Sequence, residues 1–128
     1  GVIVYNPIAG GLLSGKYSAN EAPRAGTRFT IRGAGEMYQK RYWDEAQLEA
    51  VAELARAVGE RGLAIASVAV AWVLAQPGIT SAIVGASRPE QLDATLAGAE
   101  LELDADLAGL CDQVWWRLPR RPVVEGYR

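Results

Sequence analysis

The stretch that decides the fold is TSAIVGASRPEQL, residues 80–92, in which a short apolar run is followed by a glycine turn and a helix start. Residues 82–84 suit a strand that is covered on both faces. Gly85 lets the backbone approach a ligand closely, because glycine has no side chain. We expect Ser87 to cap a helix that begins near Pro89.

The start of this helix is a candidate anion site. Its first backbone amides have no acceptor within the helix, and the helix dipole favours negative charge there. A phosphate beside Ser87, with Arg88 nearby, would fit this chemistry. An ordinary strand-to-helix connection explains the same residues equally well, since most helix N-termini bind only water.

Composition excludes several classes of function. The chain has 128 residues, 50% of them hydrophobic, and a formal net charge of -2, so it has enough apolar residues for a core and no basic surplus for nucleic acid. Cys111 is the only cysteine and histidine is absent, which excludes a disulfide framework and leaves a metal site without its usual ligands. No apolar stretch reaches membrane-spanning length and no signal peptide opens the sequence. These features predict a cytoplasmic protein that binds neither nucleic acid nor membrane.

The order of elements is typical of parallel βα units. Strands are predicted over 2–5 and 82–84, and a long loop with little periodicity over 8–41. Helices are predicted from Asp44 to Arg61, from Ser67 to Leu74, from Pro89 to about Ala97 and from Asp104 through Val114, with Asp44, Ser67 and Asp104 as N-terminal caps. Two strands make a poor sheet, so we expect the remaining strands to come from elsewhere. Because the sequence enters a strand directly after Gly1, without methionine, it reads as part of a longer protein.

A second candidate site is the loop YNPIAGGLLSGKY, residues 5–17, which follows the first strand. Parallel α/β folds bind ligands at the carboxyl ends of their strands. The glycines are expected to expose backbone amides, and Lys16 supplies a compact positive charge, so a pyrophosphate would fit. A flexible surface loop with a solvated lysine is the equal alternative, and the Walker pattern is not matched.

Other residues support weaker predictions. Arg24, Arg28 and Arg32 would close over an anion from the long loop, although solvated arginines are the default. Tyr5 would stack on a ligand ring or serve as a core residue. Without histidine there is no Ser/His/Asp or Cys/His arrangement, and no carboxylate pair is placed for acid and base catalysis, so no catalytic residue is predicted.

Taken together, YNPIAGGLLSGKY and GITSAIVGASRPEQL resemble the seventh and eighth βα units of an aldo-keto reductase, in the branch that contains the bacterial enzymes and the potassium-channel β subunits. The similarity extends to Arg117. It implies an α/β fold, with residues 1–128 forming the C-terminal fragment of a (β/α)8 TIM barrel, incomplete as given. It also implies NADP as cofactor and reduction of aldehydes or ketones by hydride transfer.

The resemblance also implies roles for individual residues. Tyr5 would stack on the nicotinamide, Lys16 would reach the cofactor phosphates, and Arg28 belongs to the segment that folds over the cofactor. Arg88 would assist at the 2′-phosphate, and Thr95 is kept as a contact on the adenine side, although Ala94 and Thr95 depart from the usual glutamate and asparagine. The pyrophosphate would be lined by Asn6, Pro7, Ile8, Ala9 and Gly10, and the adenosine and its 2′-phosphate would be held by Gly85, Ser87 and Gln91.

The family's catalytic tetrad of aspartate, tyrosine, lysine and histidine lies in earlier βα units and is absent from this chain. We therefore expect this stretch alone to be inactive, and to need the missing N-terminal barrel units for a stable fold. A small carbonyl compound is the expected substrate, of no class that we can name, in a pocket shaped by upstream loops and by residues 115–128. One alternative is a non-catalytic NADP-binding barrel that regulates a partner, like a channel β subunit. Another is a free-standing nucleotide-binding module that completes its sheet by dimerising.

Overall fold

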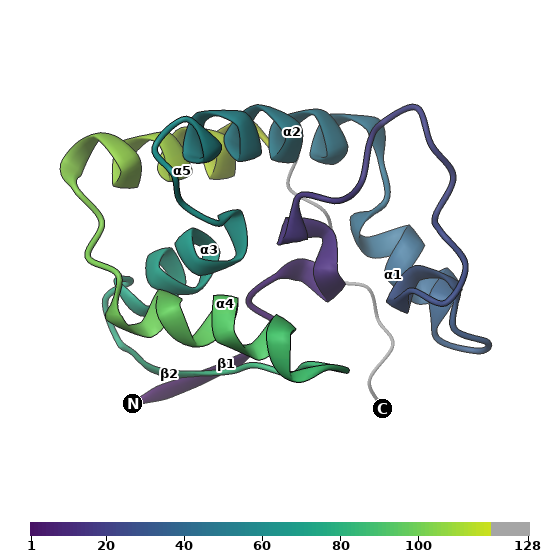
Figure 1. The fold of residues 1–128 in the computed structure, drawn as a ribbon, viewed down its shortest axis with the longest axis horizontal. Helices are drawn as coiled ribbons and strands as arrows, with labels where there is room; N and C mark the ends of the chain where they lie inside the picture. The colour runs from purple at the N-terminus through teal and green to yellow at the C-terminus, as the bar shows by residue number, and fades with distance from the viewer. Residues whose placement is uncertain (119–128) are drawn as a thin grey trace.

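The computed structural model describes residues 1–118 (Figure 1). Helices dominate the structure, and the two strands lie together at one side of it. In chain order the elements are β1 (Val2–Tyr5), η1 (Ala9–Ser14), η2 (Arg28–Thr30), α1 (Gly35–Tyr42), α2 (Glu45–Gly59), α3 (Ile65–Leu74), β2 (Ile79–Ile83), α4 (Pro89–Glu100) and α5 (Ala105–Arg117).

The two strands pair in parallel, as the sequence predicted. Tyr5 is the register partner of Ile83, so both strands reach their carboxyl ends at the same edge. Strand β2 begins at Ile79, three residues before the predicted start, and ends at Ile83. The intervening chain, which includes α2 and α3, connects the strands in the manner of a βα crossover.

One face of this sheet is bare. Ile3 and Tyr5 are each 65% exposed and Ile83 is 60% exposed, and the strand alternation and register place these side chains on the same face. Val4 and Ala82, on the opposite face, are partly buried, and α3 and α4 lie on one side of the strands in Figure 1. The prediction of strands covered on both faces is therefore wrong within the described residues, because only one layer of helices is present to cover them.

The core lies between the helices. In α2 the buried Leu48, Val51, Leu54 and Val58 recur at the helical spacing that the sequence indicated. Helix α3 is apolar nearly all round, and Val68 is fully buried. Helix α5 closes the core with Leu107, Cys111 and Val114.

Helices α3 and α4 approach closely at Gly98. A Cβ placed there would lie 2.5 Å from the Ser67 carbonyl oxygen and 2.8 Å from the Val70 Cβ. The Ser67 hydroxyl also donates a hydrogen bond of 2.6 Å to the Ala94 carbonyl, across the same interface. The absence of a side chain at residue 98 is what allows this packing.

Two of the four predicted helix caps are confirmed. The Asp44 and Asp104 carboxylates accept hydrogen bonds from the Gln47 and Leu107 amides, at 2.9 Å and 2.7 Å. Ser67 lies inside α3 rather than at its start, because the helix begins two residues earlier, at Ile65. The cap position of α4 is occupied by Arg88, not Ser87. The prediction that these two serines cap helices is therefore wrong: the Ser67 hydroxyl donates to the Ala94 carbonyl, and the Ser87 hydroxyl donates to the Gln91 side chain.

The segment predicted as a loop over 8–41 contains the helix α1 as well as η1 and η2. The sequence of α1, GEMYQKRY, has little apolar periodicity, so the signal for a helix was weak. Bonds to the preceding segment hold it instead: the Gly35 amide donates to the Ile31 carbonyl at 2.7 Å, and the Gln39 side-chain amide donates to the Phe29 carbonyl at 2.7 Å. The prediction of a loop is therefore wrong over 35–41.

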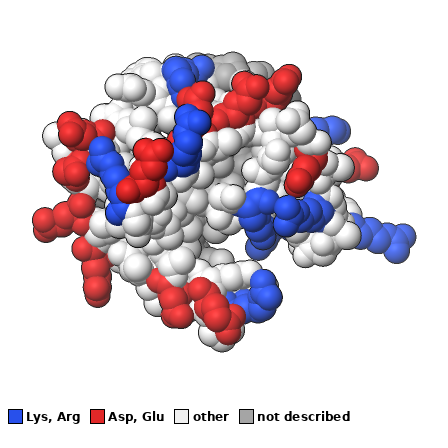
Figure 2. Space-filling model, turned by 45° about the horizontal axis from the view of Figure 1, so that its top comes forward, with Lys and Arg blue, Asp and Glu red and all other residues white. Residues whose placement is uncertain are grey.

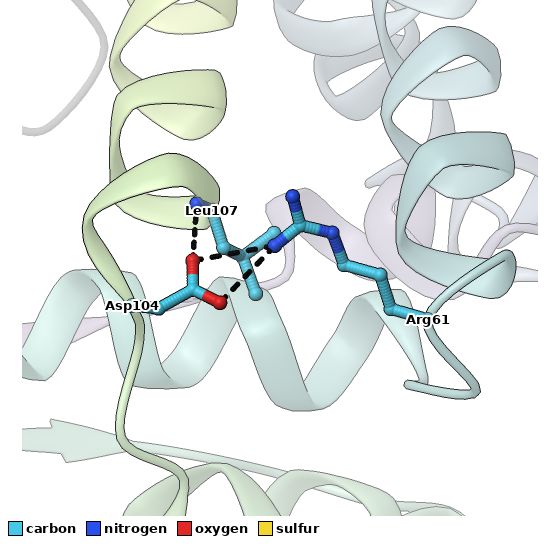
Figure 3. A network of polar contacts seen from close by, with 3 residues as sticks. All are labelled: Arg61, Asp104 and Leu107. Carbon is cyan, nitrogen blue, oxygen red and sulfur yellow. Dashed lines mark hydrogen bonds and ion pairs between the residues drawn. The ribbon is translucent and has the colours of Figure 1, made fainter.

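Charges of both signs are interleaved on the face shown in Figure 2, and neither sign covers it. Arg117 pairs with Glu53 at 2.6 Å, and Arg61 pairs with Asp104 at 3.3 Å. In Figure 3 the Asp104 carboxylate lies between the Arg61 guanidinium and the Leu107 amide. These pairs are exposed to solvent, so each stabilises the fold only slightly.

Candidate cofactor site

The two loops that the sequence singled out leave the sheet at the same edge. Because Tyr5 and Ile83 are register partners, the chain leaves β1 at Asn6 beside the point where it leaves β2 at Val84. The carboxyl edge of parallel strands is where open and closed α/β sheets bind their ligands. This edge is therefore the candidate site.

Asn6 organises the first loop. Its backbone φ is 62°, in the left-handed region that asparagine tolerates better than most residues. Its side-chain oxygen accepts a hydrogen bond of 2.7 Å from the Gly10 amide, and its side-chain nitrogen donates one of 2.9 Å to the Tyr42 hydroxyl. The loop is thus closed on itself and tied to α1.

Three consecutive backbone amides of this loop, those of residues 9–11, are already used. The Ala9 amide donates to the Asn6 carbonyl at 3.0 Å, and the Gly11 amide donates to the Ile8 carbonyl at 2.9 Å, while the Gly10 amide bonds to the Asn6 side chain. Pro7 has no amide hydrogen. The prediction that the glycines of this loop expose their amides is therefore wrong for Gly10 and Gly11, and these two amides are not free to bind an anion.

Two cations stand beside this loop, each over a tyrosine ring. The Lys16 Nζ lies 5.2 Å from the centroid of the Tyr17 ring, and the Arg28 Cζ lies 5.5 Å from the centroid of the Tyr38 ring. A Cβ placed on Gly10 would lie 3.7 Å from the Arg28 Cγ, so the fold brings Arg28 to the loop across 18 residues of sequence. Arg24 instead pairs with Glu21 at 3.3 Å, and Arg32 is exposed.

In the second loop, Ser87 and Gln91 lie together as predicted for a shared site. The Ser87 amide and hydroxyl both donate to the Gln91 side-chain oxygen, at 3.1 Å and 3.0 Å. Two donors thus converge on one oxygen, an arrangement that an anionic oxygen would also satisfy. Arg88 is exposed next to them, and a Cβ on Gly85 would meet no atom within 4 Å, so the space beside that glycine is open.

Thr95 does not join this site. It is 3% exposed, and its hydroxyl donates to the Leu92 carbonyl of its own helix at 2.8 Å. A buried hydroxyl that is already bonded has no donor to offer a ligand. We therefore correct the sequence-based prediction and leave Thr95 out of the site.

Tyr5 stands at the carboxyl end of the bare sheet face, with 65% of its surface exposed. Its exposure contradicts the alternative of a core tyrosine and leaves the ring available for stacking. Residues 119–128, which belong to the tail predicted to shape a substrate pocket, lie outside the described residues.

Sequence reasoning missed Tyr38 and Tyr42, which contact this loop from α1. They are four residues apart, the spacing that places two side chains on one face of a helix. That spacing was a usable signal, but it was not used because residues 8–41, which include most of α1, were predicted to be a loop.

Cys111 is not poised to act as a nucleophile. Burial, together with the nearby Asp112 charge, raises the pKa of the Cys111 thiol to about 11, so the thiol stays protonated at neutral pH. In residues 1–118 no group of three or more His, Cys, Asp or Glu side chains is placed to hold a metal ion. Within the same range no helix is both long enough and apolar enough to cross a membrane.

Comparison with known proteins identifies the family. The family model described as "Aldo/keto reductase family" matches residues 1–115. The chain belongs to the aldo/keto reductase family. This membership confirms the resemblance that the two loops indicated and implies a (β/α)8 barrel as the parent fold.

Aldo/keto reductase relatives of several kinds are similar to the chain. An uncharacterized oxidoreductase of Bacillus subtilis, YrpG, is 36% identical over 90% of the chain and 32% of the relative. A probable voltage-gated potassium channel subunit beta of Arabidopsis thaliana is 28% identical over 100% of the chain and 38% of the relative. Human aflatoxin B1 aldehyde reductase member 2 is 32% identical over 87% of the chain and 34% of the relative. The chain thus spans about a third of the length of these aldo/keto reductase relatives.

Proposed function

We propose that this chain supplies the dinucleotide-binding end of an NADPH-dependent aldo/keto reductase, which reduces aldehydes or ketones to alcohols. One observation carries the proposal: the two loops, far apart in sequence, begin at the same edge of the β1–β2 sheet. Lys16 and Arg28 stand at the first loop, and Ser87 and Arg88 lie on the second. An extended cofactor with phosphates at two places fits such a pair of loops.

Among the described residues, side chains offer more contacts for the cofactor than backbone amides do. Tyr5 presents an exposed ring for the nicotinamide, and Lys16 and Arg28 supply positive charge for the pyrophosphate. Gly85 and the Ser87–Gln91 pair, with Arg88 beside them, would take the adenosine and its 2′-phosphate. When bound, NADPH supplies the hydride; these residues bind and orient it, and none of them donates a proton.

We further propose that the chain corresponds to the seventh and eighth βα units of the barrel, the C-terminal part of the domain. The bare sheet face and the coverage of about a third of each relative support a partial barrel, and the assignment to these two units rests on the loop motifs at residues 5–17 and 78–92. The proton donor would then lie on preceding units. Residence in the cytoplasm, and action on a small carbonyl compound, stay predictions.

A regulatory role is the second candidate. The Arabidopsis relative named as a probable potassium channel subunit beta matches the whole chain, so a barrel that binds NADP to regulate a partner is also supported. The two candidates share the cofactor site and differ in turnover.

Cofactor binding to the intact gene product tests the proposal. We expect Arg88→Gln to weaken NADPH binding about tenfold in calorimetric titration while leaving the NADH affinity unchanged, because only NADPH carries the 2′-phosphate. Arg56→Gln, which removes the same charge at an exposed position of α2, should change neither the NADPH nor the NADH affinity. Absence of binding, or equal losses for both cofactors in Arg88→Gln, would contradict the proposed site.

Turnover separates the two candidates. Oxidation of bound NADPH on addition of a panel of aldehydes would support the reductase, whereas binding without oxidation would support the regulatory barrel. The same preparation serves both measurements, so a failure of binding and a failure of chemistry are distinguishable.

A further inference from the structure

The Asn6 side chain is engaged at both ends. Its oxygen must face the Gly10 amide, because that group can only donate, and this fixes the side-chain nitrogen toward the Tyr42 hydroxyl. The contacts measure 2.7 Å and 2.9 Å and are partly buried. Asn6 therefore holds the loop and α1 in one arrangement, and its role is structural support more than contact with a phosphate.

Tyr38 extends the same support by one helical turn. Its ring centroid lies 6.2 Å from that of Tyr42, and a Cβ on Gly10 would lie 2.7 Å from its Cδ1 atom. On Tyr38 rests the Arg28 guanidinium, 5.5 Å from the ring centroid. One face of α1 thus touches Asn6 and Gly10, which the resemblance assigned to the pyrophosphate, and Arg28, which it assigned to the segment that folds over the cofactor.

Helix α1 itself is anchored to the aromatic part of the core. Phe29 is fully buried, and its ring lies 4.9 Å from that of Trp43 and 6.4 Å from that of Tyr38. Because the helix cannot shift without disturbing these rings, the positions of its tyrosines are well defined.

We propose that α1 is a positioning element for the phosphate site, in which Tyr42 sets the shape of the loop through Asn6 and Tyr38 aims Arg28 at the pyrophosphate of the dinucleotide. The proposal rests on the proposed function. It explains how a loop whose amides at residues 9–11 are internally bonded would still bind an anion: the geometry of the cations decides the affinity, and α1 fixes part of that geometry.

The first test is Tyr42→Phe in the intact gene product, which removes the acceptor for Asn6 and keeps the ring. We expect the Kd for NADPH to rise about fivefold, as the loss of one supporting hydrogen bond would produce. At saturating NADPH, kcat should be unchanged, since no reacting group is touched. Trp72→Phe is the matched control, because it removes the donor of a 2.8 Å bond to Asp112 elsewhere in the fold; its Kd should equal that of the wild type.

Coupling gives the second readout. In an Asn6→Gly background, where glycine tolerates the positive φ, Tyr42→Phe should have no further effect on the NADPH Kd. Tyr38→Leu should also weaken binding severalfold. Tyr38→Phe should restore part of the loss, because it returns the ring beside Arg28 but not the hydroxyl that accepts a 3.5 Å hydrogen bond from the Arg28 guanidinium.

The possible outcomes are distinct. If NADPH binds and Tyr42→Phe changes Kd no more than Trp72→Phe does, the positioning role is wrong and the proposed function stands. An additive effect of Tyr42→Phe on Asn6→Gly would also overturn it. If the protein binds no NADPH, both the positioning role and the proposed function are overturned.

Discussion

Gly10 shows how one residue fixes the shape of the candidate site. Its φ is 68°, and a Cβ there would lie 2.7 Å from the Tyr38 Cδ1 atom, whose ring is held between neighbours. We expect Gly10→Ala to lower the free energy of unfolding by about 2–3 kcal/mol, combining backbone strain with overpacking. Urea denaturation of the intact protein would measure it.

Gly11→Ala is the matched control for that substitution. The φ of Gly11 is 96°, but a Cβ there would meet no atom within 4 Å. We therefore expect Gly11→Ala to lower the free energy of unfolding by about 1 kcal/mol, from backbone strain alone. Equal losses at the two glycines would show that the Tyr38 ring yields to the added methyl.

At the residue scale, sequence patterns identified local hydrogen bonds and missed those made in the folded structure. Asp44 and Asp104 were predicted correctly as caps, because the backbone amides that donate to their carboxylates lie three residues away in the chain. Ser67 was predicted wrongly because it bonds to Ala94, 27 residues away, and Thr95 because its burial depends on packing between helices. No local pattern encodes such contacts.

At the scale of elements, the crossing of α3 and α4 depends on Gly98. A Cβ there would lie 2.5 Å from the backbone oxygen of Ser67, which cannot rotate away as a side chain can. We expect Gly98→Ala to destabilise the intact protein by about 2–4 kcal/mol, despite the better helix propensity of alanine. Thermal and urea unfolding would show the loss.

Gly109 in α5 provides the opposite case. Nothing lies within 4 Å of a Cβ added there, so Gly109→Ala should stabilise the protein by about 0.5–1 kcal/mol through helix propensity alone. A loss of stability at residue 109, or none at residue 98, would contradict the packing described here.

The start of α5 carries a pH-dependent contribution. The hydrogen bond from the Leu107 amide lowers the pKa of Asp104, and the Arg61 guanidinium lowers it further (Figure 3). Because the pKa is lower in the folded state than the value of about 3.9 in an unfolded chain, this contribution is full above that value and is lost as pH falls below it.

Asp104→Asn tests this linkage, since asparagine still caps the helix but carries no charge. We expect its Tm to lie slightly below that of the wild type at neutral pH, and the difference to vanish as the pH falls below about 4. A difference in Tm that is the same at every pH would show that the carboxylate charge contributes nothing.

Both strands, and the four helices α2 to α5, were predictable from their sequence because apolar spacing agrees there with proline or glycine stops, and in α2 and α5 also with the aspartate caps. Helix α1 was not, because contacts with Phe29 and Ile31 hold it where apolar periodicity is weak. The convergence of the two loops followed from the parallel order of the strands. The contacts of Tyr38 and Tyr42 with the first loop could not be predicted, since they depend on α1, which the sequence pattern did not indicate.

At the scale of the whole molecule, the bare sheet face governs behaviour. Ile3, Tyr5 and Ile83 are 60–65% exposed side by side, and a cluster of exposed apolar side chains on a strand pair favours association. We therefore expect the 128-residue chain, produced by itself, to self-associate in light scattering and to lack a cooperative melting transition.

Substitution of the sheet face locates the cause. Ile3→Lys combined with Ile83→Lys should reduce the self-association of the isolated chain, because charges on a strand pair oppose further pairing. Leu96→Lys, at a residue of α4 that is 53% exposed, should leave it unchanged. A monomer with a cooperative two-state transition, or an equal response to Leu96→Lys, would show that the bare face needs no partner and would weaken the case that further barrel strands cover it.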